Sequence, residues 1–469
     1  MRHFTRLINL LLLAWGLCAS SARAEDIQFQ VLASFALTNG SDPWAPMVQG
    51  ADGNFYGTTY YGGPTPGGSY SSGFGTVFKL ATNGSLTALS YFYGTNGSRP
   101  RSGLVQAKDG NLYGTTHNGG ASTDIAFSEV GYGTVFRISP SGGFTNLLSF
   151  VGTNGACPAA ELVEGPDGWL YGTTRAGGST FNVPRFGANG YGCVFRVSTN
   201  GEFGLVYSFT PDSIGVSPMS ALLAASDGNL YGDCGLVAYR LSTSGVYDPI
   251  ALLDSSHAYS HLSKVCEGRD GLFYLVCHGV NSNSPGQLFS FSTNGSLSTL
   301  STFPASITFS WGGAVEGTDG SFFGTSASGG TNDAGTIYRV SPNGGFTILV
   351  SLSYSSAASP QARLIQGADG AFYGTTTYGG DFGNGAIFRV SVPSAMAPKL
   401  RSPERFGDGT TLSWSAIRGR QYRVQTATNL AAPVWNNAGP IVAATNSLNA
   451  RSSFTSSAPQ TYYRVVMLP

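Results

Sequence analysis

One short block recurs seven times along this chain of 469 residues. Its first copy is ADGNFYGTT at residues 51–59, and later copies follow Asp-Gly pairs at 109–110, 167–168, 227–228, 270–271, 319–320 and 369–370. Successive aspartates are 43 to 60 residues apart. Repeats of this period are typical of solenoids and propellers, in which each unit buries its apolar faces only against its neighbours. The repeat therefore constrains the fold more than any other feature.

Each copy contains four segments that alternate like β-strands. The Asp-Gly pair joins the first two segments, and both residues tolerate the positive φ of a tight hairpin. After a glycine-rich loop comes a third segment such as Thr134–Ile138, and a second tight turn leads to a fourth such as Leu147–Phe150. Four strands in each of seven units predict an all-β fold, a seven-bladed β-propeller, over residues 25–393.

The two ends of the repeat region complement each other. Residues 29–35 have the pattern of a fourth strand but follow no first three strands, while the seventh unit ends at residues 386–390 without a fourth strand. We expect the N-terminal strand to complete the seventh blade and close the ring. Closure of this kind removes an unpaired strand edge.

The first 24 residues have the features of a secretory signal peptide. Arg2 and Arg6 precede an apolar stretch at residues 7–17, and Ala22-Arg23-Ala24 matches a cleavage site. No later stretch is apolar and long enough to span a membrane. We therefore expect removal after Ala24 and a secreted or cell-surface protein.

Composition excludes several classes of protein. The 66 glycines argue against a mostly helical fold, and 41% hydrophobic residues argue against disorder. A net charge of zero argues against a nucleic-acid partner. We expect a monomer without a cofactor or metal. The five cysteines after the signal peptide are interpreted as buried thiols, with a Cys234–Cys277 disulfide as the alternative.

Charged residues recur in register. An aspartate stands at each tight turn, and six third segments carry a base, namely Lys79, Arg137, Arg196, Arg240, Arg339 and Arg389. A binding site needs few copies of a residue, so this recurrence indicates a structural role. We predict that the aspartates cap the turns and that the bases pair with acids or carbonyl groups.

These motifs resemble a known family. The order Asp-Gly-Asn-Leu-Tyr-Gly-Thr-Thr, Gly-Gly and Gly-Thr-Val-Phe-Arg is similar to the GloVer-type tandem repeat of secreted bacterial choice-of-anchor proteins, over residues 27–393. The resemblance implies export and a propeller-like fold, and it carries no activity or catalytic residue. Units four and five depart from it with GDC at 232–234 and LVC at 275–277.

A different pattern follows the repeats. Residues 394–398 are interpreted as a linker, and residues 399–469 alternate like the strands of a small β-sandwich. This segment is similar to fibronectin type III and immunoglobulin-like modules, with Trp414 as the expected core tryptophan.

Candidate binding residues lie on the face that carries the long loops between the second and third strands. One set forms an aromatic wall on units one to three: Tyr60, Tyr61, Tyr70, Phe74, Phe127, Tyr132, Phe181, Phe186 and Tyr191. A second set stands eight residues after each turn aspartate and is expected to line a central funnel: Tyr60, His117, Arg175, Gly235, His278, Ala327 and Thr377. The alternatives are that the aromatics hold the loops on the blades and that the second set is merely solvated.

Motifs of the common enzyme classes are missing from the sequence. It contains no G-x-S-x-G, H-E-x-x-H or P-loop, and His257 and His261 lie in an irregular segment without helical ligand spacing. Acids outside the turns are scattered over several units, whereas a glycosidase needs two that face each other. The predicted function is a secreted, non-catalytic binding module for an extracellular glycan or cell-surface component. The alternative is an exported polysaccharide-active hydrolase or lyase with its site in the funnel.

Overall fold

The computed structural model describes residues 27–64, 73–122, 124–126, 129–182, 184–185, 188–235, 237–252, 263–278, 285–393, 404–406, 409–414, 416, 421–427, 435–443, 450–455 and 462–467. The predicted signal peptide and linker lie outside these residues, as do Tyr70, Phe127, Phe186, His257 and His261. Within the described part of the chain, no helix is long and apolar enough to cross a membrane.

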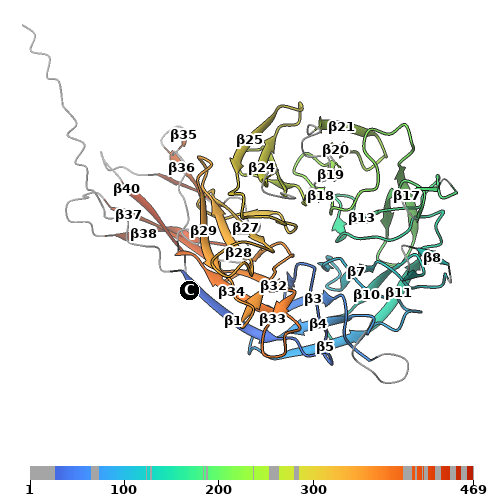
Figure 1. Cartoon of the computed structure of the whole chain (residues 1–469). Coiled ribbons are helices and arrows are strands. Elements are labelled where there is room, and N and C mark those ends of the chain that lie inside the picture. The colour runs from blue at the N-terminus through green and yellow to red at the C-terminus, as the bar shows by residue number, and fades with distance from the viewer. Residues whose placement is uncertain are drawn as a thin grey trace, which may run out of the picture.

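The repeats fold into seven four-stranded antiparallel sheets, here called sheets 1 to 7 in chain order. Figure 1 shows the sheets following one another around a common centre. The first strands are β2 (Val48–Gln49), β6 (Val105–Gln106), β12 (Val163–Glu164), β18 (Leu223–Ala224), β22 (Cys266–Glu267), β26 (Ala314–Glu316) and β31 (Ile365–Gln366). The second strands are β3 (Phe55–Thr59), β7 (Leu112–Thr116), β13 (Leu170–Thr174), β19 (Leu230–Cys234), β23 (Phe273–Cys277), β27 (Phe322–Ser326) and β32 (Phe372–Thr376).

The outer half of each sheet follows the same order. The third strands are β4 (Thr76–Leu80), β10 (Thr134–Ile138), β16 (Cys193–Val197), β20 (Val237–Leu241), β24 (Gln287–Phe291), β28 (Thr336–Val340) and β34 (Ala386–Ser391). The fourth strands are β5 (Leu86–Tyr91), β11 (Phe144–Ser149), β17 (Phe203–Ser208), β21 (Tyr247–Leu252), β25 (Leu297–Thr302), β29 (Phe346–Ser351) and, in sheet 7, β1 (Gln28–Ser34). Three short ribbons, β8 (Ile125–Ala126) with β9 (Glu129–Val130), β14 (Pro184–Arg185) with β15 (Ala188–Asn189), and β30 (Ala357–Ala358) with β33 (Tyr378–Gly379), lie outside these sheets.

The N-terminal strand β1 belongs to sheet 7. It pairs antiparallel with β34 from Gln28↔Ser391 to Ser34↔Ala386, and Figure 1 shows the blue strand beside the orange one. The strand expected to supply the missing fourth position therefore occupies it. Sheet 7 also contacts sheet 1, because the Ala368 N–H donates to Gln49 Oε1 at 2.7 Å.

The aspartate of each tight turn is a cap, as predicted. In sheet 1 the Asn54 N–H donates to Asp52 Oδ1 at 3.2 Å, and the Gly53 N–H donates to the Gly50 carbonyl at 2.9 Å. Gly53 has a φ of 81°, which only glycine adopts without strain. Each short hairpin therefore depends on the Asp-Gly pair for both its hydrogen bonds and its backbone conformation.

Five of the six third-strand bases form ion pairs with acids, which confirms the predicted pairing for these. Four of them pair with the turn aspartate of their own sheet: Lys79–Asp52 at 3.6 Å, Arg196–Asp167 at 3.8 Å, Arg339–Asp319 at 2.7 Å and Arg389–Asp369 at 2.7 Å. Arg240 pairs instead with Asp248 on the adjacent strand, at 2.6 Å. These charges therefore belong to the scaffold.

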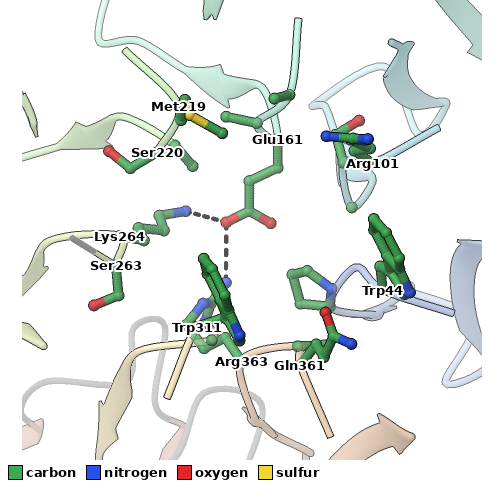
Figure 2. A pocket seen from close by; sticks show the side chains of 18 of the residues that line it. Trp44, Arg101, Glu161, Met219, Ser220, Ser263, Lys264, Trp311, Gln361 and Arg363 are labelled. Carbon is green, nitrogen blue, oxygen red and sulfur yellow. Dashed lines mark hydrogen bonds and ion pairs between the residues drawn. The ribbon is translucent and has the colours of Figure 1, made fainter. Parts of the chain in front are cut away.

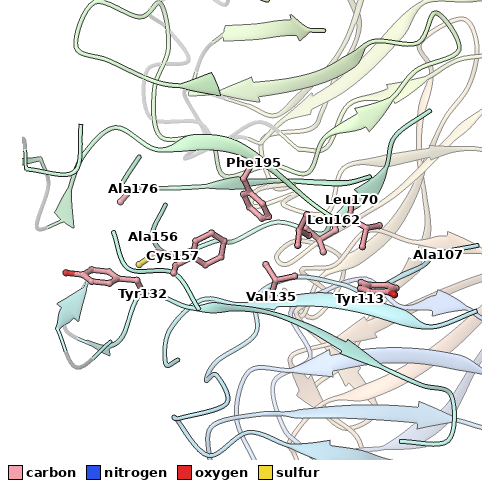
Figure 3. Packing of buried hydrophobic residues seen from close by; sticks show 12 residues of the cluster. Ala107, Tyr113, Tyr132, Val135, Ala156, Cys157, Leu162, Leu170, Ala176 and Phe195 are labelled. Atoms are coloured by element: carbon pink, nitrogen blue, oxygen red, sulfur yellow. The ribbon is translucent and has the colours of Figure 1, made fainter. Parts of the chain in front are cut away.

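Apolar side chains fill the space between neighbouring sheets. Between sheets 2 and 3, Val135 and Phe150 pack with Leu162, Leu170 and Phe195, and all five are buried (Figure 3). The Phe150 and Phe195 rings meet edge to face with centroids 5.1 Å apart. Because a single sheet would expose both apolar faces, this packing explains why the unit is repeated. The five cysteines are free thiols, so Cys234 and Cys277 are not bridged.

The C-terminal region forms two three-stranded sheets. One contains β35 (Glu404–Phe406), β36 (Gly409–Trp414) and β39 (Ala450–Thr455), and the other contains β37 (Gln421–Ala427), β38 (Asn436–Ala443) and β40 (Tyr462–Met467). Trp414 is fully buried with Leu412, Tyr422 and Val424. The predicted core tryptophan therefore lies at the centre of a separate small core.

Candidate functional site

The residues that precede each first strand share one backbone conformation. We call these segments the lead-ins; they comprise residues 42–47, 99–104, 157–162, 217–222, 263–265, 309–314 and 359–364. Six of them begin with a residue that is not glycine and has a φ between 52° and 57°, namely Asp42, Arg99, Cys157, Ser217, Phe309 and Ser359. This conformation is rare for such residues, so its recurrence shows that the same turn is built before each of these strands.

Threonine hydroxyls hold the lead-ins in place. The first threonine of the Gly-Thr-Thr motif donates to a carbonyl oxygen in the lead-in of the next sheet. The observed pairs are Thr58 to Ser102 at 2.7 Å, Thr173 to Ser220 at 3.2 Å, Thr325 to Ala362 at 3.1 Å and Thr375 to Pro43 at 3.1 Å. These bonds use the main chain of the lead-in, so they leave its side chains free to differ between sheets.

The lead-ins of all seven sheets meet around one cavity of about 460 Å³. Figure 2 shows side chains from different sheets converging on it. The larger or polar residues that line it are Trp44, Arg101, Glu161, Arg175, Met219, Ser220, Ser263, Lys264, Trp311, Gln361 and Arg363. Cavities of this size accommodate small organic ligands.

Three charged residues form a cluster in this cavity, which we call the ion cluster. Glu161, Lys264 and Arg363 stand at the same position of their lead-ins, two residues before the first strand. Lys264 Nζ and Arg363 Nη2 both contact Glu161 Oε1, the latter at 3.1 Å (Figure 2). Lys264 and Arg363 also line two further cavities, bounded by the first strands. The ion cluster therefore lies where these cavities adjoin the lead-in cavity.

Glu161 is ionised at neutral pH. Burial raises its pKa, but the nearby charges of Lys264 and Arg363 outweigh that effect and lower the pKa to about 2. The Glu161 side chain is 11% exposed. A buried carboxylate with two cationic partners stabilises both of them in place.

Arginine and aromatic rings form one wall of the cavity. Trp44 stacks on Tyr60 with centroids 4.5 Å apart and planes 15° apart. The Arg101 guanidinium lies 5.4 Å from the Trp44 ring centre, and its Nη2 donates to the Tyr60 hydroxyl at 3.3 Å. Arg101 is therefore oriented by aromatic contacts rather than by a carboxylate.

A second tryptophan, Trp311, lies on the lead-in of sheet 6. Its side chain is 40% exposed, and its ring packs against His278 with centroids 4.2 Å apart. Phe309 lies nearly parallel to it, with planes 10° apart and centroids 6.0 Å apart. Trp311 therefore presents an apolar face to the cavity on a rigid aromatic support.

The cavity is positively charged. Its lining contains four cationic side chains, Arg101, Arg175, Lys264 and Arg363, and one carboxylate, Glu161. His117 adds no charge at neutral pH, because burial and then the nearby charge of Arg101 lower its pKa to about 3. Anionic groups are therefore favoured in this space.

The predicted funnel residues lie at different depths. Arg175 lines the cavity. Tyr60, His117, His278 and Thr377 are buried and are not part of its lining. Tyr60 supports Trp44, and His278 supports Trp311. The lead-ins cover the ends of the second strands, so four of these residues form the layer behind the surface that a ligand would contact.

The described residues of the predicted aromatic wall pack on the scaffold. Tyr132 and Phe181 meet edge to face at 5.5 Å, and Tyr191 joins the core cluster between sheets 3 and 4. Tyr61 meets Tyr60 edge to face at 4.5 Å and lies beneath Arg99. None of these four lines the lead-in cavity. These contacts match the alternative interpretation, in which the aromatics hold the loops.

Most of the cavity lining was not singled out from the sequence. Trp44, Arg101, Glu161, Trp311 and Arg363 stand on segments that repeat only weakly. A signal was present, because five lead-ins place proline at the second position and an apolar residue four positions later, with variable residues between. The variable residues within that frame are the ones that line the cavity.

The sheets and the central cavity define an all-β repeat protein of β-propeller-like architecture. Residues 20–240 and 261–417 match the model of the Gloeobacter/Verrucomicrobia repeat. This match covers more than half of the sequence, and the chain belongs to this family. No curated protein has a matching sequence.

Solved structures share the fold at low sequence identity. The extracellular domain assigned to a hybrid two-component system of B. thetaiotaomicron has a TM-score of 0.52 and 11% identity, over 84% of this chain and 45% of that one. Puromycin hydrolase has a TM-score of 0.49 and 10% identity, over 82% and 61%. A gluconolactonase from Xanthomonas campestris has a TM-score of 0.42 and 12% identity, over 80% and 93%. At this identity the first of these similarities concerns the fold alone, and the other two carry no further argument.

Proposed function

We propose that this protein is an exported, non-catalytic binding module whose lead-in cavity holds an extracellular glycan. Its scaffold is a closed seven-bladed propeller over residues 25–393, followed by a linker at 394–398 and a fibronectin type III-like sandwich at 399–469. Pairing of β1 with β34 and the Ala368–Gln49 hydrogen bond between sheets 7 and 1 support closure. The features of residues 1–24 support export.

The observation that carries the proposal is the composition of the cavity wall. Trp311 offers an aromatic face that is 40% exposed, beside the amide of Gln361 and several charged donors. Sugar rings pack their C–H faces on aromatic rings while their hydroxyls need hydrogen-bond partners. The cavity provides both kinds of contact on rigid elements.

The charge state of Glu161 favours binding over hydrolysis. Most glycoside hydrolases use two carboxyl groups, one of them a general acid with a raised pKa. Glu161 is the one carboxylate in the described lining, and its pKa is lowered to about 2. It is therefore suited to holding Lys264 and Arg363 rather than to donating a proton.

The test is binding of the mature chain to an array of bacterial, plant and algal glycans. We expect Trp311→Ala to weaken binding at least ~10-fold, since about 1.4 kcal/mol of contact is lost. The control is Phe382→Ala, which removes another aromatic ring, 63% exposed, that is not part of the cavity lining. It should bind as the wild type does.

Two outcomes would contradict the proposal. One is that Trp311→Ala binds glycans as tightly as the wild type, or that no glycan binds at all. The other is release of shorter or unsaturated sugars from a bound glycan over hours, which would show the alternative function, a polysaccharide hydrolase or lyase.

A further inference from the structure

The lead-in cavity carries more positive charge than its own acid can neutralise. Lys264 and Arg363 share the single carboxylate of Glu161. Arg101 has no carboxylate partner among the described residues, and its recorded polar contact is the Tyr60 hydroxyl. The net charge of the lining is thus strongly positive, in a protein whose total charge is zero.

This excess has a cost that an anionic ligand would remove. Cations near one another in a space shielded from water repel each other, since screening there is weak. Arg101, Lys264 and Arg363 come from three different sheets, and their lead-ins are held by main-chain contacts. The cations are therefore held near each other by the scaffold rather than by mutual attraction.

We propose that the glycan bound in this cavity is acidic, with the carboxylate of a terminal uronic acid residue held by Arg101 and the cationic side of the ion cluster. This inference rests on the proposed function. Planar guanidinium groups match the two oxygens of a carboxylate. Trp311 and Trp44 supply faces for the sugar ring next to that charge.

The ion cluster also indicates which part of a glycan enters. Glu161, Lys264 and Arg363 contact one another where the lead-in cavity adjoins the cavities between the first strands. A polysaccharide cannot pass through side chains that are in contact. The cavity therefore accepts the end of a chain, and the remaining sugars extend outward past Trp311.

The test compares tetragalacturonate with the same oligosaccharide after its carboxyl groups are reduced to alcohols. Calorimetric titration should show at least 10-fold tighter binding of the acidic form, which falls as salt is raised. Arg101→Gln should weaken binding of tetragalacturonate about 10-fold and leave the reduced form unchanged. The control, Lys108→Gln, removes a cation 79% exposed and outside the cavity and should have no effect.

A second variant predicts a change of the opposite sign. Glu161→Gln removes the carboxylate that competes for Lys264 and Arg363, so tetragalacturonate should bind more tightly. Circular dichroism first establishes that the variant is folded; if it is not, Arg101→Gln still decides the question.

The outcomes separate this inference from the proposed function. Equal affinity for the acidic and reduced oligosaccharides, with binding still lost in Trp311→Ala, would overturn the acidic ligand and leave glycan binding intact. Stronger binding of a sulfated neutral sugar than of tetragalacturonate would overturn the choice of a carboxylate. No binding of any saccharide would overturn both.

Discussion

A buried tyrosine links the turn aspartate to the sheet in six of the seven repeats. The tyrosine two residues after the Asp-Gly pair donates its hydroxyl to the aspartate, at distances from 2.6 to 2.9 Å for Tyr56, Tyr113, Tyr171, Tyr231, Tyr274 and Tyr373. In sheet 6 the residue is Phe323, and Ser321 and Arg339 contact Asp319 instead. Each aspartate is therefore satisfied within its own sheet.

Removing one of these hydroxyls should destabilise the fold modestly. Tyr113→Phe leaves Asp109 without a hydrogen bond of 2.6 Å, and we expect the free energy of unfolding to fall by about 1 kcal/mol. Urea unfolding of the repeat region measures this. Tyr93→Phe, at a side chain 47% exposed, is the control and should leave the midpoint unchanged. Equal midpoints for wild type and Tyr113→Phe would show that water replaces the bond without cost.

His117 should make stability depend on pH. Burial and then the charge of Arg101 lower its pKa from 6.5 to about 3 in the folded chain. The unfolded chain therefore binds a proton more readily between these values, and stability present above pH 6.5 is lost as the pH falls towards 3. His117→Gln should lose less stability than the wild type between pH 7 and 4.5, measured as urea midpoints. Parallel curves for the two proteins would contradict this.

Among the elements, the strands and the lead-ins differ in how well the sequence predicts them. The third strand expected at Thr134–Ile138 is β10, and the N-terminal strand expected at 29–35 is β1, Gln28–Ser34. Alternating apolar residues and Asp-Gly turns act locally, so their strands can be read from short windows. Cavity residues such as Glu161, Lys264 and Arg363 meet only through the arrangement of the sheets, which no local spacing encodes.

The strand β1 should contribute to stability through one face. Phe29 packs on Phe388 with ring centroids 5.6 Å apart, whereas the next residue, Gln30, is exposed. Phe29→Ala should lower the free energy of unfolding by about 2 kcal/mol, less than a fully buried ring because Phe29 is only half-buried. Gln30→Ala is the matched control on the same strand. Similar losses for both variants would argue against the observed register.

At the scale of the whole molecule, the repeats and the C-terminal sheets have separate cores. The cluster around Trp414 contains residues between 412 and 465 alone, and the clusters of the repeats contain residues up to Val392. Units with their own cores generally unfold independently. The contacts of sheet 7 with sheet 1 belong to the repeat region.

Deleting residues 399–469 should leave the repeat region intact. We expect calorimetry of the chain 25–393 to show its main transition within about 3 °C of the full chain, because no core residue of the repeats is removed. A smaller transition should disappear. A fall of 10 °C or more would show that the C-terminal sheets stabilise the repeats.

The lead-ins have an evolutionary consequence. Their course is held by threonine hydroxyls bonded to main-chain carbonyls, so the scaffold is indifferent to which side chains they present. Trp44, Arg101, Met219 and Gln361 occupy the same position on four sheets. Tandem duplication thus produced a combinatorial surface with one variable site per copy. Members of such a family can acquire new ligand preferences by single substitutions, without first acquiring mutations that compensate for lost stability.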